Sequence, residues 1–292
     1  MVKVARNKRP KSLSHGRPPT IQKPIASLSA RATRTLIRSH HQLHKKRARA
    51  LADGNEQEVH ELDKKIEALG GLKSYQLASK TGQSKDRGGD SSKVLIEWLK
   101  PALDGLTNCE TRLRLLEVGA LSARNACSAV SCIDVVRIDL HSQEPGILEQ
   151  DFMERPIPST DADKFHIISL SLVLNYVPDA TTRGDMLRHT SAFLTSTLPT
   201  SNGSLRKLAP CLFLVLPAAC VLNSRYFTEE RLQDMMSSLG FSIIRRKLTQ
   251  KLIYQLWKYN RPANPKSGGF EKKMVNPGAK RNNFTVILTP AE

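Results

Sequence analysis

The chain has 292 residues, of which 39% are hydrophobic and 25% charged, a composition that can support a packed core. Its formal net charge of +18 is concentrated at the two ends. Residues 1–50 contain 14 basic and no acidic residues, residues 51–244 contain 20 and 25, and residues 245–292 contain 11 and 2. Basic ends on a near-neutral body indicate a polyanionic partner, although a solubilising or import-receptor tail would have the same composition.

The sequence argues against secretion, a membrane span and a metal centre. The first residues lack the apolar stretch of a signal peptide, and the apolar run 212–222 contains Pro217 and is too short to cross a bilayer. The five cysteines have no C-x-x-C spacing, so we expect free, buried thiols in a reducing compartment. His40, His41 and His44 have no acidic residue or cysteine within a turn, which favours a solvated helix face over a metal site.

The N-terminal part divides into a basic arm and a helical extension. Residues 1–26 contain four prolines among basic residues and are predicted to be a disordered arm, within which a nuclear address could lie. Residues 27–108 are predicted to be helical, with Asn55 capping the second helix and Gly70-Gly71 ending it. The expected helices cover residues 28–52, 57–69 and 92–103, the last of them capped by Ser91 or Ser92, and a polar loop covers 72–91.

From residue 109 to 292 apolar strands alternate with helical patterns. This order predicts a mainly parallel sheet with helices on both faces, ending in a hairpin. The expected strands cover 112–119, 133–139, 146–150, 165–174 and 211–217, with further β-prone stretches at 241–248, 252–259 and 284–288. The expected helices cover 121–130, 182–197 and the segment between Thr228 and Gly240.

Two residues at consecutive strand ends predict a cofactor site. Gly119 follows Glu117, itself a candidate cofactor-binding residue, and Val118 at the end of the first strand, where a glycine lets the backbone approach a ligand closely. Asp139 ends the second strand 20 residues later, where a carboxylate can bind a ribose diol. The turn has one glycine rather than G-x-G-x-x-G, which favours S-adenosylmethionine over a dinucleotide. The carboxylate of S-adenosylmethionine could accept hydrogen bonds from N–H groups at the start of the following helix. An ordinary strand-end turn is the alternative.

Two further strand ends carry candidate ligand-binding residues. Asp151 could accept a hydrogen bond from the adenine amino group of the cofactor while the ring of Phe152 lies against the base, although an ordinary turn is equally compatible. After the fourth strand, the Asn175 amide could accept from the exocyclic amine of a substrate adenine and Tyr176 could stack on it. Tyr176 could instead pack on the next helix.

Several of these segments together resemble the fungal 25S ribosomal RNA adenine-N1-methyltransferase family. The resemblance covers residues 72–289 and rests on LLEVGALSARNAC, VVRIDLHS, LEQDFMERP, FHIISLSLVLNYVPDATTRGDMLRHT, NSRYFTEERLQDMMSSLGF and SYQLASKTGQS. It implies a class I methyltransferase, that is, a Rossmann-like, mainly parallel seven-stranded sheet, here with the N-terminal helical extension. It also implies that Gly119 and Asp139 bind the cofactor and that Tyr75, Gln76 and Gln83 close over it.

The function implied by this resemblance is methylation of N1 of one adenine in 25S ribosomal RNA, with S-adenosyl-L-methionine as cofactor. The expected partner is then the pre-ribosomal large subunit, the expected compartment is the nucleolus, and a monomer suffices. The main alternative is a non-catalytic S-adenosylmethionine sensor that acts through protein partners, because related animal proteins have that role. A protein or small-molecule methyltransferase is a second alternative, but it would not need the basic ends. A third is a ribosome-assembly factor with a degenerate pocket, which an empty pocket on cofactor titration would support.

Overall fold

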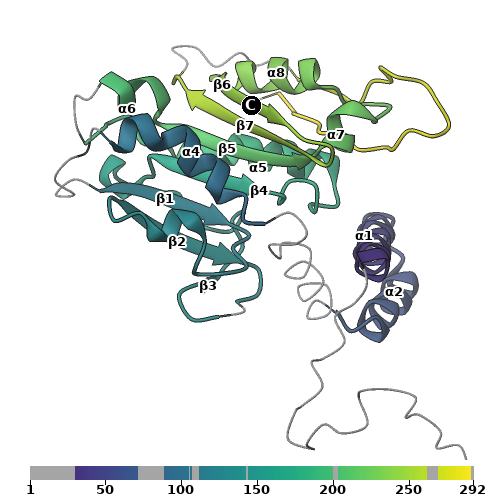
Figure 1. The fold of residues 1–292 in the computed structure, drawn as a ribbon. Helices are drawn as coiled ribbons and strands as arrows, with labels where there is room; N and C mark the ends of the chain where they lie inside the picture. The colour runs from purple at the N-terminus through teal and green to yellow at the C-terminus, as the bar shows by residue number, and fades with distance from the viewer. Residues whose placement is uncertain are drawn as a thin grey trace, which may run out of the picture.

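Seven strands form one sheet in the order β3-β2-β1-β4-β5-β7-β6 (Figure 1). The structure is a computed structural model that describes residues 30–71, 89–104, 106, 112–142, 144–199, 203–261 and 269–290. The strands are β1 Leu113–Val118, β2 Ile133–Asp139, β3 Leu148–Glu149, β4 Ile167–Ser171, β5 Cys211–Pro217, β6 Phe241–Leu248 and β7 Leu252–Tyr259. This confirms the predicted mainly parallel, seven-stranded sheet.

The first five strands are parallel, so their carboxyl ends lie along one edge of the sheet. β7 runs antiparallel to both β5 and β6, which confirms the late hairpin. β1 lies between β2 and β4, and the strand order reverses direction at the β1–β4 pair. In such sheets ligands bind beyond the carboxyl ends at this switch point, so we expect the ligand site at the ends of β1 and β4.

Helices cover both faces of the sheet because the central strand β5 is apolar on both. Leu212, Leu214 and Leu216 point into the cluster formed with α5 (Ala180–Phe193) and α8 (Glu229–Ser238). Cys211, Phe213 and Val215 alternate with them and face the cluster formed with α4 (Ser92–Leu103) and α6 (Gly203–Leu208). The alternation has the period of two that places successive strand residues on opposite faces.

Most helix boundaries follow the predicted capping residues. Asn55 accepts a hydrogen bond from Glu58 N, and Thr228 accepts one from Arg231 N. Gly240, with φ of +86°, follows α8 in the left-handed conformation that ends helices. Ser91 occupies the N-cap position of α4 without capping it, and the carboxylate of Asp90 accepts from Ser92 N instead, at 2.8 Å.

Three predicted elements differ in the structure. The helix expected at 121–130 is wrong: only the 3-10 turn η2 (Ala126–Ala129) forms, because Ala126 N and Cys127 N donate to the side chains of Asp90 and Ser92. β4 ends at Ser171 rather than at residue 174, since Leu172 has a φ of +58°. The stretch 284–288 contributes one isolated bridge, between Phe270 and Leu288, and no strand of the sheet.

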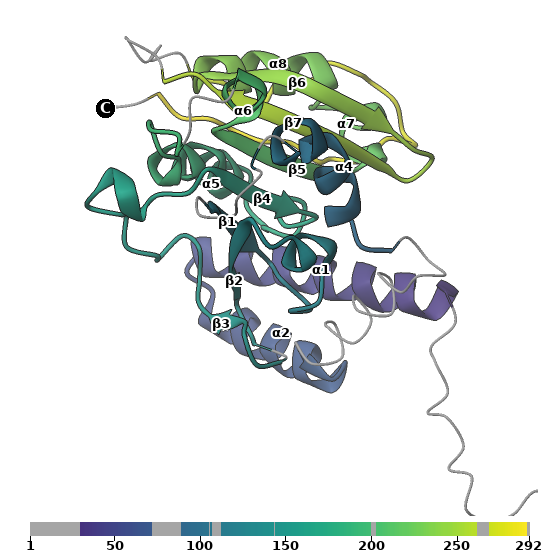
Figure 2. The ribbon, with the colours of Figure 1, turned by 60° about the vertical axis from the view of Figure 1, so that its left-hand side comes forward.

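The N-terminal helices α1 (Ala30–Ala52) and α2 (Glu56–Ala68) form a hairpin beyond the carboxyl ends of the parallel strands (Figures 1 and 2). Arg47 pairs with Asp63 between them, with an Nε–Oδ1 distance of 2.5 Å. His40 is 5% exposed and its ring centroid lies 4.4 Å from that of His44, so His40 is buried rather than solvated as expected. The hairpin confirms the predicted helical extension, whereas residues 1–26 lie outside the described part.

The described residues contain four free, buried cysteines, at positions 127, 132, 211 and 220. Within the same ranges we find no cluster of three His, Cys, Asp or Glu residues that could hold a metal ion. Nor does any described helix combine the length and the apolar character needed to cross a membrane.

The C-terminal segment 269–290 packs against the first turns of α5. Ile287 N donates to Ala180 O at 2.9 Å, and the backbone passes so close to Gly184 that a Cβ there would lie 1.8 Å from Ile287 O. A side chain at position 184 would therefore force the helix and the segment apart.

We expect Gly184→Ala to lower the free energy of unfolding by about 2 kcal/mol or more, because the obstacle is backbone rather than a movable side chain. Gly203→Ala is the matched control, since nothing lies within 4 Å of a Cβ at that position of α6. Urea unfolding of both variants measures the difference, and equal stabilities would contradict the close packing at Gly184.

Candidate cofactor and substrate site

The turn after β1 requires glycine at position 119. Gly119 has a φ of +74°, and a Cβ there would lie 2.6 Å from Cγ2 of Val173 in the loop after β4. Gly119 N and Ala120 N both donate to Ile138 O near the end of β2, at 2.8 and 3.1 Å. The turn is therefore held against β2 and in contact with the β4 loop, which brings three strand ends together.

Asp139 ends β2 beside this turn. Its Oδ1 accepts a hydrogen bond from His141 N at 2.9 Å, which fixes the carboxylate at the carboxyl edge of the sheet. β2 is paired with β1 up to Ile138 and Val118, so Asp139 is the neighbour of the glycine turn. A carboxylate at this position can bind the two hydroxyls of a ribose.

Asp151 and Phe152 follow the short strand β3. Oδ1 of Asp151 accepts from Met153 N at 2.8 Å. Phe152 is 2% exposed, and its ring packs in the core 5.0 Å from the ring of His189 and 5.3 Å from that of Phe193. The ring of Phe152 is therefore part of the hydrophobic core next to the end of β3. This differs from the expectation that the ring would lie on a bound adenine.

Glu117 is buried under the turn, with 8% of its surface exposed. Its Oε1 accepts from Nδ2 of Asn125 at 2.6 Å, and Sγ of Cys127 lies 3.8 Å from its Oε2. Burial raises the pKa of Glu117 to about 7, while the hydrogen bond from Asn125 and the charge of Arg137 oppose that rise. Within the described chain Glu117 holds the β1–β2 connection in place.

The N–H groups of η2 are already used. Ala126 N donates to Asp90 at 2.6 Å and Cys127 N donates to Ser92 at 3.2 Å. The start of η2 therefore does not offer the carboxylate-binding N–H groups that the predicted helix would have provided. The predicted binding of the cofactor carboxylate by a helix start is therefore wrong, because the helix expected at 121–130 does not form.

The loop after β4 contains the candidate substrate residues. Leu172 adopts a left-handed conformation that is rare for leucine, and its N–H donates to Val215 O at 2.9 Å. Tyr176 N donates to Val173 O at 2.8 Å, which closes a turn around Asn175. Oδ1 of Asn175 is buried and has no hydrogen-bond partner within the described residues. An acceptor left without a donor in this position is suited to an N–H group of a ligand.

The start of α4 completes the site, and sequence reasoning missed it. Oγ of Ser91 lies 2.7 Å from Oγ of Ser171, the last residue of β4. Asp90 binds both Ser92 N and Ala126 N, as described above. The sequence identified only Ser91 and Ser92, as helix-capping candidates, because nothing in the spacing reveals a contact with β4. Tyr75, Gln76 and Gln83 lie outside the described residues.

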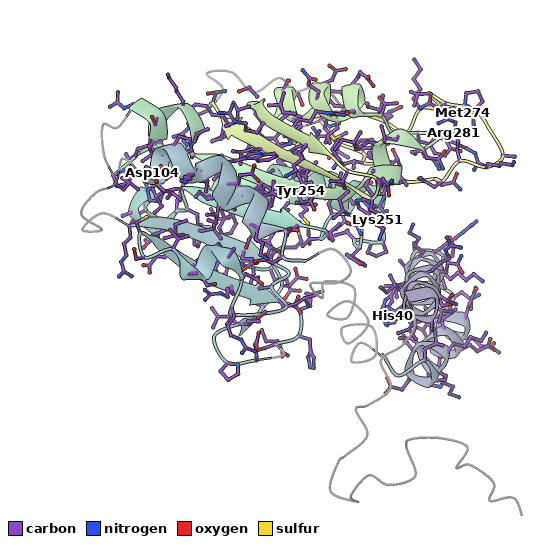
Figure 3. All side chains as sticks on the ribbon, in the orientation of Figure 1. His40, Asp104, Lys251, Tyr254, Met274 and Arg281 are labelled. Atoms are coloured by element: carbon purple, nitrogen blue, oxygen red, sulfur yellow. The ribbon has the colours of Figure 1, made fainter. Side chains whose placement is uncertain are left out.

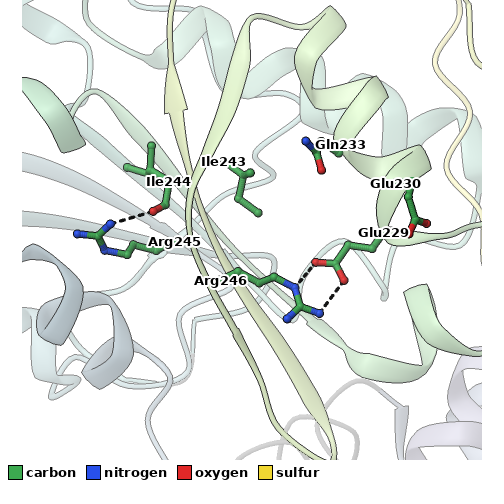
Figure 4. Close-up of a pocket in the computed structure, with 7 residues that line it drawn as sticks. All are labelled: Glu229, Glu230, Gln233, Ile243, Ile244, Arg245 and Arg246. Atoms are coloured by element: carbon green, nitrogen blue, oxygen red, sulfur yellow. Dashed lines mark hydrogen bonds and ion pairs between the residues drawn. The ribbon is translucent and has the colours of Figure 1, made fainter.

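A shallow groove of about 340 Å³ lies elsewhere, between α8 and the edge strand β6 (Figure 4). Its Arg246 guanidinium is paired with Glu229, with an Nη2–Oε2 distance of 2.8 Å. The groove is lined by Glu229, Glu230, Gln233, Ile243, Ile244, Arg245 and Arg246. None of the candidate cofactor residues borders this groove, so the two sites are separate.

The strand order, the glycine turn after β1 and the carboxylate at the end of β2 define a class I S-adenosylmethionine-dependent methyltransferase. Residues 60–286 match the family described as "25S rRNA (adenine(2142)-N(1))-methyltransferase, Bmt2", and the chain belongs to that family.

Two curated relatives are also named as 25S rRNA adenine-N(1) methyltransferases. The "25S rRNA adenine-N(1) methyltransferase" of Schizosaccharomyces pombe is 38% identical over 255 residues, which cover 86% of this chain and 89% of the relative. The "25S rRNA (adenine(2142)-N(1))-methyltransferase" of Saccharomyces cerevisiae is 40% identical over 225 residues, which cover 76% of this chain and 61% of that protein.

Solved structures show only a distant likeness. A Burkholderia thailandensis 1,6-didemethyltoxoflavin-N1-methyltransferase is 14% identical, with a TM-score of 0.39, over 63% of this chain and 87% of that one. An rRNA methylase from Escherichia coli is 14% identical, with a TM-score of 0.33, over 78% of this chain and 77% of that one.

We expect Gly119→Ala to weaken the binding of S-adenosylhomocysteine at least about tenfold. A residue with a Cβ loses about 1–2 kcal/mol in the left-handed conformation, and relief of the contact with Val173 would displace the β4 loop. Gly54→Ala is the control, because Gly54 has a similar φ of +69° and nothing within 4 Å of a Cβ. Isothermal titration calorimetry should find Gly54→Ala unchanged, and equal affinities for all three proteins would contradict the assignment.

We expect Glu117→Gln to flatten the pH dependence of stability. The pKa of Glu117, about 7 when folded, lies above its unfolded value, so the folded protein binds more protons between those two values. The free energy of unfolding of the wild type should therefore fall as pH rises through this window, by at most about 1.4 kcal/mol per pH unit, and level off above it.

The measurement is urea unfolding of both proteins between about pH 5 and pH 8. The stability of Glu117→Gln relative to the wild type should increase with pH across the window. Glu61→Gln, at an exposed position of α2, is the control. A constant difference between Glu117→Gln and the wild type would show that Glu117 is not held in its neutral form.

Proposed function

We propose that the protein transfers the methyl group of S-adenosylmethionine to N1 of an adenine in 25S ribosomal RNA. The family and both relatives are named for this reaction. The observation that carries the proposal to this chain is the buried Oδ1 of Asn175, which has no hydrogen-bond partner among the residues that the structure describes. It lies in a loop that also contacts the glycine turn through Val173, so one loop faces both the cofactor and the substrate.

Bound at the ends of β1 and β2, the cofactor supplies an electrophilic methyl group. Asp139 would hold its ribose, Gly119 would leave room for its close approach, and Asp151 would face its adenine amine. These residues fit the group, because a side chain at position 119 has no space and the two carboxylates follow neighbouring strands.

Asn175 selects and orients the substrate base. Its Oδ1 accepts a hydrogen bond from the exocyclic N6 amine, which turns the N1 lone pair towards the methyl group, while Tyr176 stacks on the ring. The N1–C bond forms as the C–S bond breaks, and the positive charge passes to the adenine, which can release a proton from N6. Alignment supplies much of the rate, and N1 must be free of base pairing, by flipping where necessary.

Exposed cations of α1, of the β6–β7 turn that bears Lys251 (Figure 3) and of the C-terminal loop would hold the RNA phosphates. The guanidinium of Arg225 donates to Gly278 O, Ala279 O and Oδ1 of Asn283, which fixes the basic C-terminal loop. Affinity from such contacts falls with salt and carries little sequence preference. The cations are Lys45, Lys46 and Arg49 of α1, Lys251 of the β6–β7 turn, and Lys272, Lys273 and Lys280 of the C-terminal loop.

We also propose that the protein acts in the nucleolus and as a monomer. A substrate in the pre-ribosomal large subunit requires the enzyme where that particle assembles, and the basic composition of residues 1–26 suits a nuclear address. Every site residue named above comes from one chain, so a monomer suffices.

We expect Asn175→Ala to reduce methylation of a large-subunit RNA fragment by roughly 10- to 100-fold, since a hydrogen bond to the base is lost. Binding of S-adenosylhomocysteine should stay within about twofold of the wild type, because cofactor contacts lie on β1 and β2. Asn260→Ala, which removes an exposed amide beyond β7, is the control and should keep full activity. Unchanged methylation by Asn175→Ala would exclude its role.

The cellular test is mass spectrometry of 25S ribosomal RNA from cells that lack the gene, complemented with the wild type or with Asp139→Ala. Loss of one N1-methyladenosine that only the wild type restores would support the proposal. Normal methylation in the deletion strain, together with cofactor binding by the purified protein, would favour the non-catalytic sensor.

A further inference from the structure

Arg183 is a buried cation in the first turn of α5, directly after the substrate loop. It is 3% exposed, and within the described residues it forms no salt bridge with a carboxylate. Instead its guanidinium donates to three backbone carbonyls. A charge buried in this way is costly to keep unless its hydrogen bonds are all used, so the arrangement needs an explanation.

Two of the three carbonyls belong to the substrate loop. Nε of Arg183 donates to Val177 O at 2.8 Å, and Nη2 donates to Pro178 O at 3.1 Å. These residues immediately follow Asn175 and Tyr176. The residue after Pro178 is fixed as well, because Asp179 caps α5 by accepting a hydrogen bond from Thr182 N at 2.8 Å.

The third carbonyl belongs to the C-terminal segment. Nη1 of Arg183 donates to Thr285 O at 2.5 Å, and the guanidinium carbon lies 4.7 Å from the ring centroid of Phe284. The planar fork of arginine can reach carbonyls in different directions at once, which the single ammonium of lysine cannot reproduce. Arg183 thus joins two segments about a hundred residues apart in the chain.

The surroundings of Arg183 show that its charge is not placed there to bind an anion. All three of its nitrogens are used by carbonyls, and the ring of Phe284 covers the guanidinium. Burial lowers the pKa of Arg183, whereas the nearby Cys220 and Asp179 side chains raise it. What the residue provides is a fixed position for the peptide groups 177 and 178.

We infer that Arg183 is a positioning residue for methyl transfer, which holds the Asn175–Pro178 loop against the C-terminal segment so that Asn175 faces the reacting methyl group. The inference rests on the proposed function. It gives the C-terminal segment a role in the site, although none of its residues needs to touch the substrate. It also explains why the segment packs on α5 so closely that position 184 excludes a side chain.

The test compares Arg183→Lys with Arg188→Lys. Arg188 lies on the same helix and also binds the C-terminal segment, since its guanidinium donates to Thr289 O. Within the described residues, its hydrogen bonds and ion pair involve Thr289 and Asp185 rather than the loop. For Arg183→Lys we expect the single-turnover methylation rate at saturating RNA and cofactor to fall at least tenfold. The KM for RNA and the Kd for S-adenosylhomocysteine should stay within about threefold. Arg188→Lys should keep the wild-type rate.

Hydrogen exchange supplies a second readout that does not need activity. In Arg183→Lys the amides of residues 173–178 should exchange at least tenfold faster, while those of β5 and the later turns of α5 keep their protection. Phe284→Leu, which removes the ring but no hydrogen bond, should give a smaller change in the same direction. If Arg183→Lys folds poorly, the exchange measurement on Phe284→Leu tests the inference in its place.

The outcomes separate this inference from the proposed function. A wild type that does not methylate RNA contradicts the proposed function. The exchange data would then still test whether Arg183 holds the Asn175–Pro178 loop in place. A wild type that is active, with Arg183→Lys equally fast and its loop equally protected, overturns the inference. Equal losses of rate in Arg183→Lys and Arg188→Lys would also overturn it, because they would show a general effect of the C-terminal segment.

Discussion

The site depends on the close approach of Gly119 to Val173. Strand order places β1 beside β4, but side chains of ordinary size would keep the two strand-end loops apart. Because position 119 has no Cβ and a positive φ, the first loop turns back towards β2 and the second can lie directly against it. The glycine turn proposed to bind the cofactor and the loop that bears Asn175 are thus neighbours, as a transfer between two bound ligands requires.

Segments remote in sequence hold both loops in these conformations. The start of α4 contributes Asp90, which binds the η2 backbone, and Ser91, which meets Ser171 at the end of β4. The C-terminal segment acts through Arg183 on the far end of the same loop. The left-handed conformation of Leu172 costs on the order of 1–3 kcal/mol and persists where surrounding contacts fix it. The β4 loop is therefore fixed at both ends by tertiary hydrogen bonds.

The sequence was sufficient for elements that local patterns determine. Apolar runs predicted β1, β2 and β5, and the capping chemistry of Asn55 and Thr228 predicted two helix starts. It failed at the expected helix 121–130, because tertiary acceptors take the N–H groups that a helix would use. Long-range contacts such as that of Ser91 leave no periodic signal, and nothing in the sequence distinguishes the buried Arg183 from the many exposed cations. The strand-end positions of Gly119 and Asp139 follow from spacing, whereas the burial of Phe152 does not.

The cations of this chain consequently serve two different physical purposes. Exposed lysines and arginines on α1, the β6–β7 turn and the C-terminal loop can exchange counterions for phosphates, so their contribution depends on salt. Arg183 is excluded from solvent and bonded to carbonyls, so salt has little access to its interactions. In the proposed function, affinity for RNA and geometry at the base are therefore set by separate groups. Because the acceptor that Asn175 would offer is neutral, the proposed selectivity for an adenine amine would not compete with the attraction between exposed cations and RNA phosphates.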